Sequence, residues 1–205
     1  MQSENKHMGV LLSLTEVKKE RKGTICIYTH KNEVVNKYEL PVLSAHEGIP
    51  GHHYENLKHR EKYPLYIRIT PYTAYSEGWG LYCEGLLKPK NNYELYWQII
   101  YNLHRSIRLV VDTGIHYYGW SYDKCFNYMK KLLPNEDTEI KNEIYRYICD
   151  PGQALCYKIG ELKLLELRNK YFKSYKEDYI SFHKLIMDIG PVPLDILEKE
   201  IMKLL

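Results

Sequence analysis

Two short segments of the chain hold residues that together could bind a metal ion. The first contains His46, Glu47, His52 and His53, and the second contains Glu77. Two imidazoles and one carboxylate are a common ligand set for zinc in a hydrolase, and they leave the fourth coordination position for water. A glutamate directly after the first histidine ligand binds no metal and can accept a proton from that water. These residue types indicate a zinc-dependent hydrolase with Glu47 as its general base.

The spacing of the histidines differs from the common zinc motif, in which two histidines four residues apart share one face of a helix. His46 and His52 are six residues apart, so a regular helix would place them on different faces. Pro50 and Gly51 lie between them; proline interrupts a helix, and glycine tolerates unusual backbone angles. We therefore expect a break that brings His52 to the position of the second ligand. His53 is the alternative ligand, or a residue that supports the ligands or faces the substrate.

The third ligand is predicted from a separate helix. Glu77 lies 25 residues after His52, at the start of a stretch to Leu87 whose pattern favours a helix. Taken alone, each histidine is more often hydrogen-bonded or solvated than bound to metal. The combination of His46, His52 and Glu77, rather than any single residue, predicts a Zn²⁺ site.

These motifs resemble those of the domain-of-unknown-function family 885, a group of zinc-metallopeptidase-like proteins similar to thermolysin-like and carboxypeptidase Taq-type enzymes. The match begins with His46-Glu47-x-x-Pro50-Gly51-His52 and with Glu77-Gly78-Trp79-x-x-Tyr82-x-Glu84. Three later stretches also match, from Arg108 to His116, from Pro151 to Glu161 and from Phe182 to Leu194. The resemblance runs from about Tyr28 to Leu197, and its motifs occur in the family's order.

The resemblance implies a mainly α-helical, multi-helix zinc-peptidase-like domain of the gluzincin type. It also implies Zn²⁺ as the cofactor and a short peptide as the substrate, cleaved either as by a carboxypeptidase or within the peptide. With 205 residues and no break in composition, the chain is expected to form a single domain. Because family members are considerably longer, this domain is expected to correspond to their carboxy-terminal, catalytic half. The expected partners are therefore a missing amino-terminal half or a second copy of the chain.

Further polar residues are predicted to lie together on a helix. Arg108, Asp112 and His116 are spaced by four residues and therefore share one helical face. A carboxylate there can orient an imidazole toward a substrate or a metal. A buried structural pair of Asp112 and His116 explains the same spacing equally well.

Tyr157 is a candidate for stabilising the oxyanion that forms when a peptide bond is attacked. It matches a position of the family-like motif, and related zinc peptidases are similar in placing a tyrosine or histidine near the metal. Gln153 lies four residues before Tyr157, on the same face of a predicted helix. His116 is the alternative for the oxyanion role, and Gln153 is a candidate for binding substrate.

The pattern of apolar residues predicts a chain of helices with one short strand or hairpin near the N-terminus. Thr24 to Thr29 is rich in β-branched residues and favours a strand. Leu95, Ile99, Leu103, Ile107 and Val111 recur every four residues and predict a long buried helix from Asn92 to Tyr118. Further helices are expected over 39–47, 136–148, 153–171 and 175–187, and Pro193 is expected to open the last one. Residues 1–23 are polar, without clear helical periodicity, which is typical of a disordered segment.

Composition limits the classes of function. The net charge of +3 is too small to indicate a nucleic-acid partner, and 44% hydrophobic residues are ordinary for a globular protein. No apolar run approaches the length that crosses a membrane, so no membrane association is expected. The five cysteines have no paired spacing, which favours reduced, buried thiols in a cytoplasmic protein.

The sequence therefore predicts a zinc metallopeptidase that cleaves short peptides. The main alternative is a truncated, catalytically inactive relative that acts as a metal-binding or partner-binding module. A zinc hydrolase that acts on a different amide or on an ester is a third interpretation.

Overall fold

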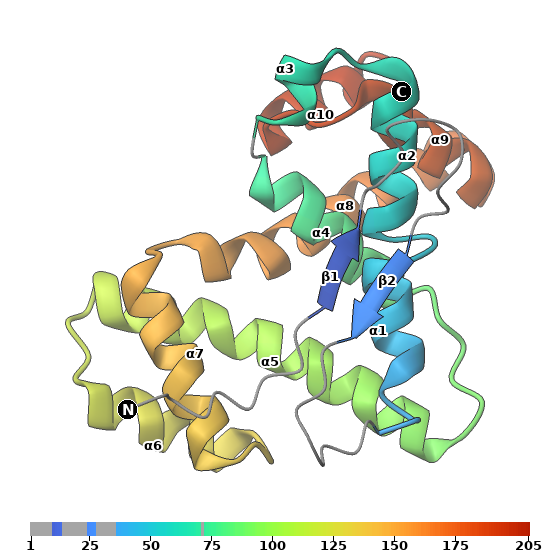
Figure 1. Ribbon diagram of the computed structural model, residues 1–205. Coiled ribbons are helices and arrows are strands. Elements are labelled where there is room, and N and C mark those ends of the chain that lie inside the picture. The colour runs from blue at the N-terminus through green and yellow to red at the C-terminus, as the bar shows by residue number, and fades with distance from the viewer. Residues whose placement is uncertain (1–9, 14–23, 28–35, 71) are drawn as a thin grey trace. The chain divides into compact units, whose positions relative to one another are not determined.

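The computed structural model describes residues 10–13, 24–27, 36–70 and 72–205, and these residues are mainly helical (Figure 1). The strands are β1 (Val10–Ser13) and β2 (Thr24–Ile27). The helices are α1 (Leu40–Glu47), α2 (His52–Lys62), α3 (Leu65–Arg68), α4 (Thr73–Glu84), α5 (Asn92–His116), α6 (Tyr122–Leu132), α7 (Asp137–Cys149), α8 (Gln153–Ser174), α9 (Tyr179–Ile189) and α10 (Leu194–Met202).

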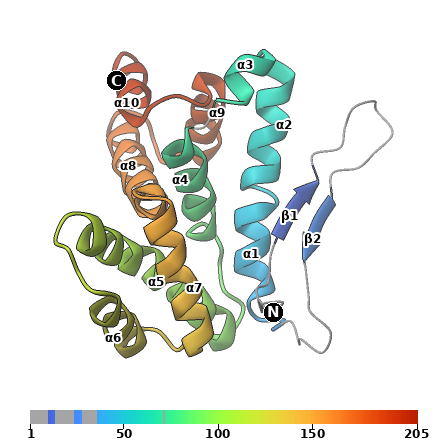
Figure 2. The same cartoon turned by 60° about the vertical axis from the view of Figure 1, so that its left-hand side comes forward.

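The two strands pair antiparallel, with Val10 opposite Ile27 and Ser13 opposite Thr24 (Figures 1 and 2). β2 occupies the first four residues of the segment for which we predicted a strand, and residues 28–29 lie outside the described part. Within residues 1–23, for which we expected no regular structure, Val10–Ser13 form β1. The remainder of that segment also lies outside the described residues.

By their internal contacts, the described residues form two compact units. The first unit combines the residues up to Leu43 with Lys88–Leu155, and the second combines Ser44–Leu87 with Cys156–Leu205. These units are groups of mutual contacts, and the single domain expected over residues 1–205 stays a prediction. Each unit is built from stretches that are distant in sequence, and composition does not reveal such a division.

The core of the first unit is formed by α5, α6 and α7. Its buried residues include Ile107 and Val111 of α5, Met129 of α6, and Ile140 and Ile144 of α7. The apolar stripe predicted for α5 is therefore buried in its second half. In the first half, Leu95 is 43% exposed and Ile99 is 55% exposed. α5 has 25 residues, whereas α6 and α7 have 11 and 13, so these shorter helices cannot cover its full length.

The core of the second unit is formed by α4, α8, α9 and α10, which lie together in both views (Figures 1 and 2). Its fully buried residues include Trp79 of α4, Leu164 and Leu167 of α8, Phe182 of α9 and Leu197 of α10. Burial of one such side chain stabilises the fold by roughly 1.5–3 kcal/mol. This unit contains all the residues predicted to bind metal.

Two glycines let α4 and α8 approach closely. A Cβ atom added to Gly160 would lie 2.0 Å from the backbone oxygen of Ala74, and one added to Gly78 would lie 2.5 Å from the Cα of Gly160. No side chain fits at either position without moving a helix. This contact sets the distance between the helix that carries Glu77 and the helix that carries Tyr157.

We expect Gly160→Ala to lower the free energy of unfolding by about 1–3 kcal/mol, the usual cost of overpacking. Gly85→Ala is the matched control, because a Cβ there would meet only Tyr82 O, at 3.3 Å. Denaturation by urea, followed by circular dichroism, measures both variants. Equal unfolding free energies for the two variants would show that the close helix contact is not required.

The described helices include none that is both long enough and apolar enough to cross a membrane. Four cysteines have described side chains, and all four are free thiols: Cys83, Cys125, Cys149 and Cys156. Cys83 and Cys125 are buried, as expected. Cys149 is exposed, contrary to our expectation, because the last turn of α7 faces solvent at that residue.

Candidate metal centre

His46 and His52, the two predicted histidine ligands, lie on separate helices. α1 ends at Glu47 and α2 begins at His52, as the Pro50-Gly51 pair predicted, and the Ile49–Pro50 peptide bond between them is cis. A Cβ atom on Gly51 would lie 1.9 Å from the backbone oxygen of His46, so only glycine permits this close return of the chain. The turn therefore brings His52 back beside His46.

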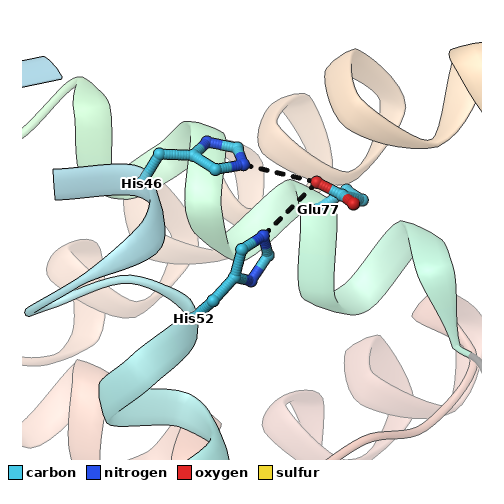
Figure 3. A group of neighbouring side chains, drawn as sticks. All are labelled: His46, His52 and Glu77. Carbon is cyan, nitrogen blue, oxygen red and sulfur yellow. Dashed lines mark ion pairs between the residues drawn. The ribbon is translucent and has the colours of Figure 1, made fainter. Parts of the chain in front are cut away.

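His46, His52 and Glu77 point toward one another from α1, α2 and α4 (Figure 3). The Nε2 atoms of His46 and His52 each lie 3.4 Å from Oε2 of Glu77. The two imidazole rings are 4.7 Å apart and nearly perpendicular. One ligand atom from each of the three residues lies within 4.8 Å of the others, so their positions suit a shared metal ion.

The donor atoms of this group fit zinc. Tetrahedral zinc with bonds of about 2.0–2.1 Å places neighbouring ligand atoms about 3.3 Å apart. The separations of 3.4 Å between each Nε2 and Oε2 match that value. Oε2 of Glu77 is buried and accepts no hydrogen bond from the described residues. A buried carboxylate oxygen without a hydrogen bond is costly unless a cation compensates it.

The charges in the group favour a cation at its centre. Burial alone would lower the pKa of His52, but the carboxylates of Glu55 and Glu77 outweigh burial and raise that pKa to about 10. Burial alone would raise the pKa of Glu77, but the imidazoles of His46 and His52 hold it well below its usual range. A metal ion would supply the positive charge that a proton on His52 otherwise provides.

Two buried carboxylates lie behind the histidines. Nδ1 of His46 is 2.7 Å from Oε1 of Glu84, and Nδ1 of His52 is 3.4 Å from Oε2 of Glu55. Both glutamates are only 2% exposed. Our reading of the sequence did not assign either a role, although Glu84 lies seven residues after Glu77 and so on nearly the same helical face. Spacing alone does not distinguish such a glutamate from one that faces solvent.

Three other predicted residues lie next to the group of His46, His52 and Glu77 in sequence or in space. Glu47 directly follows His46 and is half-buried, and its carboxylate makes no hydrogen bond or ion pair with any residue in the described part of the chain. The ring of Tyr157, on α8, stacks on the ring of His46 with centroids 6.4 Å apart. His53 is half-buried beside His52 but is not a member of the converging group. The geometry therefore favours His52 over His53 as a ligand.

The remaining predicted residues belong to the first unit and hold parts of it together. His116 bonds through Nε2 to the backbone oxygen of Tyr147, at 2.9 Å. Asp112 accepts a hydrogen bond from the backbone nitrogen of Gly152, at 3.1 Å. Both side chains thus bind backbone groups rather than each other. These contacts are structural, but the two side chains do not form the buried pair that the spacing suggested, and His116 is exposed.

Arg108 and Gln153 take part in a charged cluster of the first unit. Arg108 donates a hydrogen bond to Glu143 at 3.1 Å, and Arg146 donates one to Gln153 at 2.9 Å. Burial tends to raise the pKa of Glu143, but Arg108, His104 and the Tyr147 hydroxyl lower it to about 2. Arg108 and Gln153 therefore have polar partners within the protein, and these contacts explain their presence without a bound substrate.

The chain is similar to two solved structures, both with the description "putative lipoprotein". The structure from Colwellia psychrerythraea is 31% identical, has a TM-score of 0.87, and matches 95% of this chain and 35% of its own. The structure from Shewanella oneidensis, titled as of unknown function, is 19% identical, has a TM-score of 0.76, and matches 91% of this chain and 37% of its own. The chain thus spans about a third of the length of these proteins.

No curated protein matches the chain. A family model, in contrast, matches residues 13–201, which is nearly the whole sequence. The chain therefore belongs to the family DUF885, described as "Bacterial protein of unknown function".

Proposed function

We propose that this chain is a zinc-dependent hydrolase, and specifically a metallopeptidase that cleaves short peptides. The observation that carries the proposal is the convergence of His46, His52 and Glu77. Both Nε2–Oε2 separations match those of a tetrahedral zinc site, and all three donor atoms lie within 4.8 Å of one another. The glutamate directly after the first ligand adds the group that a hydrolase requires as a general base.

In this proposal, His46, His52 and Glu77 hold the zinc ion. The bound metal would polarise the peptide carbonyl and lower the pKa of a water molecule. The carboxylate of Glu47 has no partner among the described residues and is therefore available to accept the proton of the attacking water. It then delivers a proton to the leaving amine. Tyr157 stacks on His46, and its hydroxyl is proposed to donate a hydrogen bond to the developing oxyanion.

The second candidate function is a metal-binding or partner-binding module without catalytic activity. The chain spans about a third of the length of the two similar structures, so a substrate cleft built with the remaining two thirds would not be formed by this chain alone. The exposed apolar residues Leu95 and Ile99 of α5 also suit a surface that is covered by a partner segment or by a second copy.

Two proposals about location remain. A cytoplasmic location is consistent with the four free thiols among the described cysteines. The description of the two similar structures as lipoproteins applies to those proteins, and for this chain it would instead suggest a location outside the cytoplasm.

The two functions are separated by measuring hydrolysis with and without metal. The purified chain, loaded with Zn²⁺, is incubated with a mixture of short peptides and with simple amide and ester substrates, and the products are identified by mass spectrometry. We expect peptide cleavage that chelation abolishes and added Zn²⁺ restores. The positions of the cut bonds distinguish release of terminal residues from internal cleavage. A chain that retains zinc but cleaves none of these substrates would support the module.

A further inference from the structure

The metal group contains an asymmetry in how its two histidines are held. His46 belongs to the last turn of α1 and contacts Glu84 at 2.7 Å, a short ion-pair distance. His52 is the first residue of α2, directly after the turn, and the Gly51 that caps this helix offers no side-chain hydrogen bond. The imidazole of His52 therefore needs another support to keep its Nε2 atom directed at Glu77.

Glu55 is placed to give that support. It lies one turn after His52 on α2, and its Oε2 atom is 3.4 Å from Nδ1 of His52. A carboxylate at Nδ1 holds the proton on that nitrogen and leaves the Nε2 lone pair free to face a metal. Because Glu55 is only 2% exposed, its other oxygen also requires a partner.

That partner comes from the helix that carries Glu77. The hydroxyl of Ser76 donates a hydrogen bond to Oε1 of Glu55, at 2.6 Å. Ser76 directly precedes Glu77 on α4. This bond therefore links Glu55, which contacts the proposed ligand His52, to the neighbour of the proposed ligand Glu77. His59 contributes a weaker contact, with its Nδ1 atom 3.8 Å from Oε1 of Glu55. The carboxylate of Glu55 is thereby fixed between α2 and α4.

We propose that Glu55, fixed by Ser76, is the positioning residue for His52 and sets how tightly the site holds its metal. This inference rests on the proposed zinc site. Glu55 touches neither the metal nor the substrate, and it acts through the orientation of the His52 imidazole. Residues in this position behind a histidine ligand typically change metal affinity by 10- to 100-fold when they are replaced.

The test measures metal affinity rather than hydrolysis. Zn²⁺ affinity is determined by competition with a chromophoric chelator, and the site is also loaded with Co²⁺, whose visible absorption reports ligand geometry. We expect Glu55→Gln to weaken Zn²⁺ binding by about 10- to 100-fold and to shift the Co²⁺ absorption. Ser76→Ala should change both measurements in the same direction but by less. The double variant should resemble Glu55→Gln, because Ser76 acts through Glu55.

Glu61→Gln is the matched control, since it removes a carboxylate from the same helix at a side chain that is 67% exposed. It should leave affinity and absorption unchanged, which excludes a general effect of charge.

Wild-type affinity and absorption in Glu55→Gln would overturn the inference while leaving the zinc site intact. Should Glu55→Gln fail to fold, Ser76→Ala decides by the same two measurements: a shift supports the inference, and wild-type values overturn it. A wild-type chain that binds neither metal would refute the zinc site itself.

Discussion

His52→Ala is expected to lose the zinc that the wild-type chain retains, and His53→Ala is expected to keep it. Nε2 of His52 lies 3.4 Å from the shared Glu77 oxygen, whereas His53 is outside the converging group. Zinc sites with four ligands bind with about 10–16 kcal/mol, so one ligand accounts for roughly 3 kcal/mol, or more than a hundredfold in affinity. Elemental analysis after dialysis should find one zinc per wild-type chain and almost none in His52→Ala.

The adjacent position provides the control for this prediction. Both substitutions remove one imidazole from the first turn of α2, so a general effect on that helix would appear in both. Zinc lost from His53→Ala and kept by His52→Ala would transfer the ligand role to His53. A wild-type chain without zinc, prepared without chelators, would contradict the proposed hydrolase.

Glu47→Gln is expected to reduce peptide turnover by about 10²- to 10⁴-fold, the usual contribution of a positioned general base. The amide keeps the shape of the side chain but cannot accept the proton. Zinc content should stay at the wild-type level, because Glu47 is not in the converging group of ligands. Turnover is measured on a peptide that the wild-type chain cleaves, and zinc is measured in the same preparations.

Two outcomes would contradict this role. Loss of zinc together with activity would make Glu47 part of the metal-binding structure. Wild-type turnover in Glu47→Gln would place the general base elsewhere. Glu61→Gln serves again as the control, because it replaces a largely exposed glutamate of α2 and should change neither turnover nor zinc content.

Strong local signals made much of the helical structure predictable. Apolar periodicity predicted α5 and α7 nearly to their ends, and Pro193 is the residue directly before α10. α2, α3 and α6 were not predicted. α2 has the sequence HHYENLKHREK, in which only one leucine and one tyrosine interrupt polar residues, so no apolar stripe marks it as a helix. Its stability depends on packing against α4 and α9, which periodicity along one segment does not express.

The convergence of His46, His52 and Glu77 was predictable because a metal site, which we propose here, requires particular residue types at particular places. Two imidazoles and a carboxylate specify the ligand set, and the Pro50-Gly51 pair specifies that the helix must break between His46 and His52. The polar strip of Arg108, Asp112 and His116 was equally regular in spacing, yet Asp112 and His116 bind backbone groups of the first unit. Helical spacing determines which side chains share a face, but not what that face contacts.

The sequence alone determined the family, the helical class, the break between α1 and α2, and the choice of His46, His52 and Glu77. Each of these follows from local backbone restrictions or from residue identity. Only the tertiary structure decided that Glu55 and Glu84 stand behind the two histidines and that Ser76 fixes Glu55. The contacts of Glu84 with His46 and of Ser76 with Glu55 join α4 to α1 and to α2, and side chains of different helices meet only through packing. The contact of Glu55 with His52 lies within α2, a helix that apolar periodicity did not predict. The sequence shows a glutamate at each position but does not show whether its side chain lies in solvent or contacts an imidazole.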